Sequence, residues 1–182
     1  MRVPFFAACA LLGGSACIVE APGGDKSPPP AQAVVPQVPP LSTTIGANLG
    51  GKVELTSSSI VPGRIAPAEQ AKVTLYFKVL EELDKEYMVF VHVEDAEGRS
   101  FRLNLDHRPA GGTYPTTQWR KSETVKDEFF LALPSGISSK RLNLWAGLWE
   151  PQADVRLTLR NPDSVKNDGN NRVLVAQLPV GP

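Results

Sequence analysis

The sequence predicts an all-β protein: an immunoglobulin-like antiparallel β-sandwich of about eight strands, preceded by a disordered, proline-rich tether. Three observations predict this fold. Short β-prone runs separated by turn residues recur from residue 48 to the end, and no segment shows convincing helical spacing. Seven of the 21 residues in 21–41 are proline, a composition that favours extended polyproline geometry over a packed core.

The expected strands cover residues 52–60, 71–80, 87–94, 99–105, 122–133, 140–149, 155–159 and 172–178. Residues 71–80 alternate cleanly between apolar and polar, as in a strand with one buried face. Residues 87–94 are apolar on both faces, which is typical of a central strand. A turn at 95–98 joins that strand to 99–105, so the two form a predicted hairpin.

Residues 113–133 begin as an aromatic loop and become a strand. Pro115 fixes its own φ and favours an extended Tyr114. Trp119 is the largest apolar side chain of the loop, so we expect it to plug an edge of the core and to stabilise the fold. Because strands precede and follow this loop, it is the expected long connection of the sandwich.

The amino terminus has the three parts of an export signal: a positive start, an apolar run over residues 3–12, and then small residues. The apolar run has about ten residues, half of the roughly twenty that a membrane-spanning helix needs. We therefore expect a signal peptide over residues 1–16.

Gly14, Ser15, Ala16 and Cys17 resemble the lipobox of bacterial lipoproteins. In that family the cysteine becomes the first mature residue and carries acyl chains. The resemblance implies lipidation of Cys17 and a location in the bacterial cell envelope. Ile18 is no strong retention signal, so an outer membrane is the expected site. The alternative is ordinary cleavage after Ala16, which would leave a free thiol.

The remaining composition limits the function. The chain has 19 Lys and Arg against 19 Asp and Glu, whereas nucleic-acid binding favours a basic excess, so no nucleic-acid partner is expected. Both cysteines lie in the first 17 residues. This excludes a disulfide-stapled fold and a thiolate metal site downstream, and no cofactor or metal is expected.

Several polar residues have a structural and a catalytic interpretation. Asp106 and His107 could form an oriented general base, which keeps an envelope hydrolase as an alternative, but no Gly-x-Ser-x-Gly nucleophile elbow occurs. His92 is expected to be a core histidine bonded to backbone. Asp127 is expected to accept hydrogen bonds from the loop. Asp168 and its neighbours could ligate calcium or form an ordinary turn.

Trp145, Gly147 and Trp149 fall on one face of one predicted strand. They could form a platform on which a sugar stacks, with Gly147 as a flat gap. Alternatively, the rings cover the second face of a sheet and Gly147 permits close approach, which is the expectation that we favour because aromatic side chains mostly pack.

The order of motifs across residues 50–180 resembles a β-sandwich accessory domain of some bacterial protein-mannosyltransferase-type membrane glycosyltransferases. The resemblance rests on residues 89–92, 95–98, 114–116, Trp119, 123–127, 133–134 and 144–149. It implies a binding module without catalysis, because the transferase membrane region is absent from this sequence.

We therefore expect three parts: an export signal at 1–16, a lipidated cysteine with its linker at 17–47, and a β-sandwich at 48–182. The leading hypothesis is a non-catalytic binding or scaffolding module, anchored to the membrane through its acyl chains, whose further partner is an envelope protein or a glycan. Carbohydrate binding through exposed tryptophans is the main alternative. The candidate binding residues are Tyr114, Trp119, Trp145, Trp149 and His107.

Overall fold

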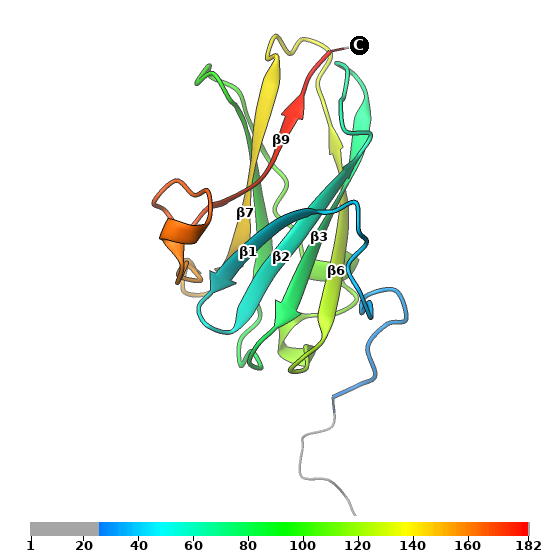
Figure 1. The fold of residues 1–182 in the computed structure, drawn as a ribbon, viewed down its shortest axis with the longest axis vertical. Helices are drawn as coiled ribbons and strands as arrows, with labels where there is room; N and C mark the ends of the chain where they lie inside the picture. The colour runs from blue at the N-terminus through cyan, green and yellow to red at the C-terminus, as the bar shows by residue number, and fades with distance from the viewer. Residues whose placement is uncertain (1–25, 182) are drawn as a thin grey trace, which may run out of the picture.

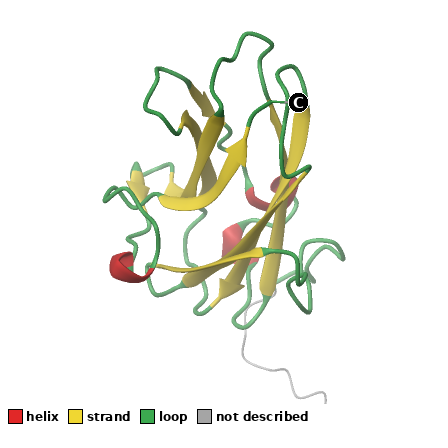
Figure 2. Cartoon of the chain, turned by 45° about the horizontal axis from the view of Figure 1, so that its top comes forward, coloured by secondary structure: helices red, strands yellow, loops and turns green. Residues whose placement is uncertain are grey.

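The computed structural model describes residues 26–181 and confirms the predicted all-β, immunoglobulin-like sandwich (Figure 1). Its strands are β1 (Thr43–Leu49), β2 (Val53–Val61), β3 (Gln70–Val79), β4 (Met88–Asp95), β5 (Arg102–Asn104), β6 (Thr124–Ala132), β7 (Arg141–Glu150), β8 (Val155–Arg156) and β9 (Val173–Pro179). The helical elements among the described residues are three short 3₁₀ turns: η1 (Pro109–Gly112), η2 (Thr116–Gln118) and η3 (Pro162–Ser164) (Figure 2). None of these helices is long and apolar enough to cross a bilayer.

The strands form two antiparallel sheets that pack face to face (Figure 1). The first has the order β1-β2-β3-β6. In the second sheet, β5 pairs with β4 and β4 pairs with β7. Both β8 and β9 also pair with β7. The chain crosses between sheets after β3, again after β5 and again after β6. The aromatic loop is the second of these crossings, which confirms that it is a long connection of the sandwich.

The core lies between the sheets and follows the predicted alternation. Val73, Leu75 and Phe77 of β3 are fully buried, and so are Val89 and Val91 of β4. Each strand contributes every second side chain to this layer, since successive residues of a strand face opposite sides.

The aromatic loop closes one end of the core. Trp119 is fully buried, as predicted, and its ring lies 5.7 Å from that of Phe77. Its indole N–H donates to the Tyr114 carbonyl at 3.0 Å, and the Tyr114 hydroxyl donates to Glu123 Oε2 at 2.7 Å. Burial and the adjacent Glu123 carboxylate both raise the pKa of Tyr114, so its hydroxyl stays a donor.

The sandwich begins earlier than the expected boundary at residue 48. β1 already starts at Thr43, and Ala47 and Leu49 are fully buried in it. The sequence pattern missed this strand because its register shifts between Thr44 and Ala47, where Gly46 takes a positive φ of 73°. The extra backbone length breaks the two-residue period on which strand prediction depends.

Part of the expected tether also packs on the domain. We call residues 26–42 the N-terminal arm, and it runs beside β6 (Figure 1). Val34 bridges Val125 of that strand, the Val35 N–H donates to the Thr124 carbonyl, and Ala33 is 4% exposed. The expectation of a disordered tether is therefore corrected for residues 33–35, which pair with β6.

His107 and Asp127 join the aromatic loop to β6. The His107 Nε2 lies 2.8 Å from Asp127 Oδ2, and its Nδ1 lies 2.6 Å from the Leu105 carbonyl oxygen. Both partners are acceptors, which assigns a proton to each ring nitrogen and a positive charge to the ring. Asp127 also accepts from the Ala110 N–H at 2.8 Å. It therefore bonds to backbone as predicted, but at η1, just before the aromatic loop.

We expect that removing residues 43–47, the first five of the seven residues of β1, destabilises the fold. A chain starting at Asn48 loses several cross-strand pairs, each worth ~0.2–1 kcal/mol. If the loss totals about 2 kcal/mol, Tm falls by roughly 4–8 °C for a domain of this size. Thermal melts of chains starting at Thr43 and at Asn48 measure this difference, and a chain starting at Lys26 isolates the effect of the N-terminal arm. Equal melts from Thr43 and Asn48 would contradict a structural role for residues 43–47.

The charged His107 should make stability depend on pH. Burial alone lowers the pKa of His107, but the hydrogen bond and charge of Asp127 outweigh burial, so the pKa is raised above its ordinary value. Charged His107 then contributes fully to the free energy of unfolding below the pKa of about 6.5 that a histidine has in the unfolded chain. This contribution is lost as the pH rises through the higher pKa of His107 in the folded protein. We expect His107→Gln to cost ~1.5–3 kcal/mol at pH 6, as for a charge-assisted hydrogen bond, and less at pH 9. Urea unfolding of both proteins across this range is the measurement; a pH-independent difference would refute the charged assignment.

Candidate functional site

The outer face of the five-stranded sheet carries a layer of aromatic side chains. In the pairing of β4 with β7, Phe90 lies opposite Gly147, and His92 lies opposite Trp145. Directly opposed residues of an antiparallel pair share one face. Trp149 continues this row at the end of β7, so aromatic rings from two strands lie side by side on a face directed away from the core.

Gly147 does not leave an open platform between the tryptophans. A Cβ atom at this position would lie 2.6 Å from Phe90 Cζ, so the Phe90 ring occupies the gap. Phe90 is only 2% exposed as a result. This geometry supports the favoured expectation, in which Gly147 permits close approach and the rings cover the sheet.

Two arginines cover parts of the aromatic layer. The Arg156 guanidinium carbon lies 4.8 Å from the Phe90 ring centroid, and that of Arg172 lies 5.3 Å from the Trp145 centroid. Both distances fit cation–π contacts. Arg172 is held in place by Glu94 at 2.6 Å and by Asp168 at 2.6 Å. The hydrogen bond from Arg172 lowers the pKa of Glu94, so this network stays ionised.

His92 is buried as expected, at 5% exposure, but it lies in this outer layer and its partners are side chains. The expectation of a core histidine bonded to backbone is therefore corrected. Burial lowers the pKa of His92, and the nearby Arg102 and Arg156 charges lower it further against the opposing effect of Asp106. The neutral ring accepts from Arg102 Nη2 at 2.9 Å through Nδ1 and has Asp106 Oδ1 3.7 Å from Nε2.

A groove of about 670 Å³ opens beside the aromatic layer. It lies where the end of β7, the start of β8 and two loops meet the face of β4. Its lining combines aromatic, charged and amide side chains: Phe90, His92, Asp106, Trp149, Asp154, Val155, Arg156, Thr158, Gly169, Asn170 and Asn171.

The charged groups of the groove are held in position by neutral partners. Asp154 accepts from the Trp149 indole N–H at 3.0 Å, and Asp106 accepts from the Val91 N–H at 2.9 Å. Arg156 donates to the Asn170 carbonyl at 3.1 Å. Within residues 26–181, neither Asp154 nor Arg156 forms a salt bridge. The groove thus presents donors and acceptors whose charges are not already neutralised by each other.

The predicted binding residues are not brought together. Tyr114 and Trp119 are fully buried, so they cannot contact a ligand and are corrected to core residues. The Trp145 ring lies under Arg172 and outside the groove lining. His107 lies on the connection between sheets, bonded to Asp127. Among the five candidates, Trp149 alone lines the groove.

The alternative chemistries lack the geometry that the sequence suggested. Asp106 does not orient His107; it points toward His92, while both nitrogens of His107 bond to other acceptors. Asp168 uses its carboxylate on Arg172 and on loop N–H groups. In the described part of the chain, no three His, Cys, Asp or Glu side chains gather around a common point.

Sequence reasoning missed most of the groove. Asp154 and Arg156 stand in a predicted turn and strand start, and Asn170 lies in a polar loop; each pattern has an ordinary structural explanation. Their association depends on β8 pairing with the end of β7 and on the loop before β9 folding back toward the same edge. The sequence does place acidic and basic residues at a turn directly after Trp149, which is a weak sign of a polar site. This pattern does not show which strand or loop lies opposite.

Neither a family model nor a curated protein matches this sequence. Among solved structures, the chain is similar to the C-terminal domain of wzt, with 15% sequence identity and a TM-score of 0.46. The match covers 79% of this chain and 80% of that one. At this level the likeness concerns the arrangement of strands and carries no information on ligand or role.

Proposed function

We propose that this protein is a non-catalytic, lipid-anchored binding module of a bacterial envelope and that a neutral glycan binds in the outer-face groove. The observation that carries the proposal is the groove itself, in which the Trp149 ring stands beside Asp106, Asp154 and Arg156. The fold positions these polar groups: within residues 26–181 Asp154 and Arg156 form no salt bridge, and Asp106 Oδ1 lies 3.7 Å from Nε2 of the neutral His92.

Sugars match such a lining by their chemistry. A pyranose ring has an apolar C–H face, which an aromatic ring can cover, and a rim of hydroxyls that both donate and accept hydrogen bonds. Carboxylates such as Asp106 and Asp154 would accept from hydroxyls, and the Arg156 guanidinium would donate to them. Hydrogen bonds to charged groups are the stronger ones, which suits an uncharged ligand rich in hydroxyls.

The charge of the groove favours a neutral glycan over an acidic one. Asp106 and Asp154 contribute two negative charges, Arg156 contributes one positive charge, and His92 is neutral. A uronate or phosphate in this groove would face a net negative environment, and like charges oppose binding. Neutral hydroxyls carry no such penalty.

Neither histidine is placed to act as an acid or a base on a ligand in the groove. Acid–base catalysis needs a group that can exchange a proton with the ligand. His107 has both nitrogens engaged and lies away from the groove lining. His92 is 5% exposed, with Arg102 bonded to Nδ1. We therefore assign both side chains to holding the fold and the groove.

The glycan proposal predicts selective loss of binding on changing the groove. Affinity electrophoresis through gels that contain a neutral polysaccharide, with uronate-containing polysaccharides in parallel gels, should retard the protein only in neutral gels. Trp149→Ala and Arg156→Ala should abolish the retardation. Phe130→Ala is the matched control, because Phe130 is an aromatic residue of the other sheet and is 61% exposed. Unchanged retardation of both groove variants would refute the site, and absence of retardation across a broad glycan panel would refute the ligand class in favour of a protein partner.

The anchor is a separate prediction, since Cys17 lies outside the described residues. The small-residue run before Cys17 resembles a lipobox, so radiolabelled fatty acid should enter the wild-type protein in its native host. Cys17→Ala should remove the label and release the protein from membranes. Cys17→Ser with equal labelling would show that the acyl chains are elsewhere.

A further inference from the structure

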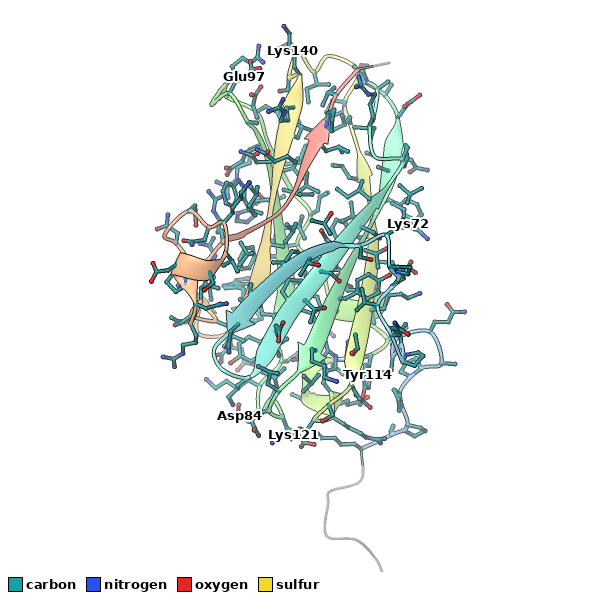
Figure 3. The ribbon with its side chains drawn as sticks, viewed as in Figure 1. Lys72, Asp84, Glu97, Tyr114, Lys121 and Lys140 are labelled. Atoms are coloured by element: carbon teal, nitrogen blue, oxygen red, sulfur yellow. The ribbon has the colours of Figure 1, made fainter. Side chains whose placement is uncertain are left out.

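We infer that one end of the sandwich faces the membrane that holds the acyl chains, and that the groove opens on the membrane-proximal half of the domain. We call this the proximal end: the loop between β3 and β4 (residues 80–87) together with residues 119–123. The inference rests on the proposed anchor at Cys17. Asp84 and Lys121 mark the proximal end in Figure 3, while Glu97 and Lys140 lie at the opposite end.

The chain enters the domain at the proximal end. The Lys26 ammonium bonds to Glu82 at 2.9 Å and to the Trp119 carbonyl at 3.0 Å. The Arg120 guanidinium donates to the Lys26 carbonyl at 2.6 Å and to the Ser27 carbonyl at 3.1 Å. Four bonds therefore fix the point at which the path from Cys17 reaches the fold.

Few residues of the sequence stand between Cys17 and that point. Eight residues separate Cys17 from Lys26. At ~3.3–3.6 Å per residue, even a fully extended connection reaches only about 30 Å. A short connection attached at one end of an elongated domain biases that end toward the surface to which the connection is anchored.

The acidic loop of the proximal end is paired with basic residues. Each of the four acidic residues in the loop between β3 and β4 forms a salt bridge with a basic residue from another segment, namely Glu81 with Lys121, Glu82 with Lys26, Asp84 with Lys52, and Glu86 with Arg108. Attraction of proteins to anionic lipids requires clustered unpaired basic residues. The orientation should therefore come from the connection and not from lipid charge.

The groove lies close to the proximal end. Lys85 of the loop bonds to Glu150 at 3.0 Å, and Glu150 directly follows the groove residue Trp149. Trp149 also lies opposite Met88, where β4 leaves the loop. A ligand in the groove is consequently held beside the membrane and is best supplied by glycans of the same surface.

Energy transfer to a lipid acceptor tests the orientation. After Cys17 the sequence has no cysteine, so Asp84→Cys, Lys121→Cys, Glu97→Cys and Lys140→Cys can each be labelled singly in the acylated protein. The proteins are placed in vesicles with acceptor-labelled headgroups, either zwitterionic or anionic. We expect several-fold greater transfer from positions 84 and 121 than from 97 and 140, equally in both vesicle types. Equal or reversed transfer from vesicle-bound protein would overturn the inference and leave the anchor intact.

A double variant tests whether the contacts of Lys26 and Ser27, and not the acyl anchor alone, set the orientation. Arg120→Ala with Glu82→Ala removes three of the four bonds at Lys26 and Ser27 without changing Cys17. It should reduce the difference in energy transfer between the two ends. An unchanged difference would overturn the assignment of orientation to these contacts. Failure of the wild-type protein to stay on vesicles would instead refute the acyl anchor, and the inference with it.

Discussion

The burial of Trp119 is the constraint on which the rest of the structure depends. The chain must pass from β5 in one sheet to β6 in the other, and an irregular crossing leaves backbone groups and the end of the core exposed. Trp119 fills that end, its N–H returns to the Tyr114 carbonyl, and Glu123 receives the Tyr114 hydroxyl. Truncation of a buried tryptophan costs ~3–5 kcal/mol, a large share of the ~5–15 kcal/mol that stabilises a domain. The same loop then provides the contacts that receive the incoming chain at Lys26.

The fold was predictable where apolar and polar residues alternate without interruption along a strand. β3 alternates without interruption, so Val73, Leu75 and Phe77 were assigned to the core from their spacing alone, and the structure confirms this. β1 was missed because Gly46 adds a residue to the pattern. The burial of Trp119 could be expected from a large ring between a proline loop and a strand. Its partner Phe77 could not, because that contact depends on how the two sheets stack.

The groove could not be predicted because it belongs to no single segment. The sequence pattern places Trp149 on the correct face of its strand. Phe90 fills the space beside Trp149, and only the register of β4 against β7 determines this. Asp106 follows β5 and Arg156 lies in β8, so their proximity follows from two further pairings. Local sequence records which residues are polar, whereas cross-strand register decides which of them meet.

The N-terminal arm has a consequence for how copies of this chain can associate. β6 is the last strand of its sheet, and an open edge offers unpaired N–H and C=O groups to any other extended chain. Ala33 and Val35 occupy part of that edge through bonds to Lys126 and Thr124. Prolines on either side keep the arm from extending into a longer strand that could itself recruit a neighbour. The segment thus covers an edge through which two copies of this chain could otherwise exchange strands.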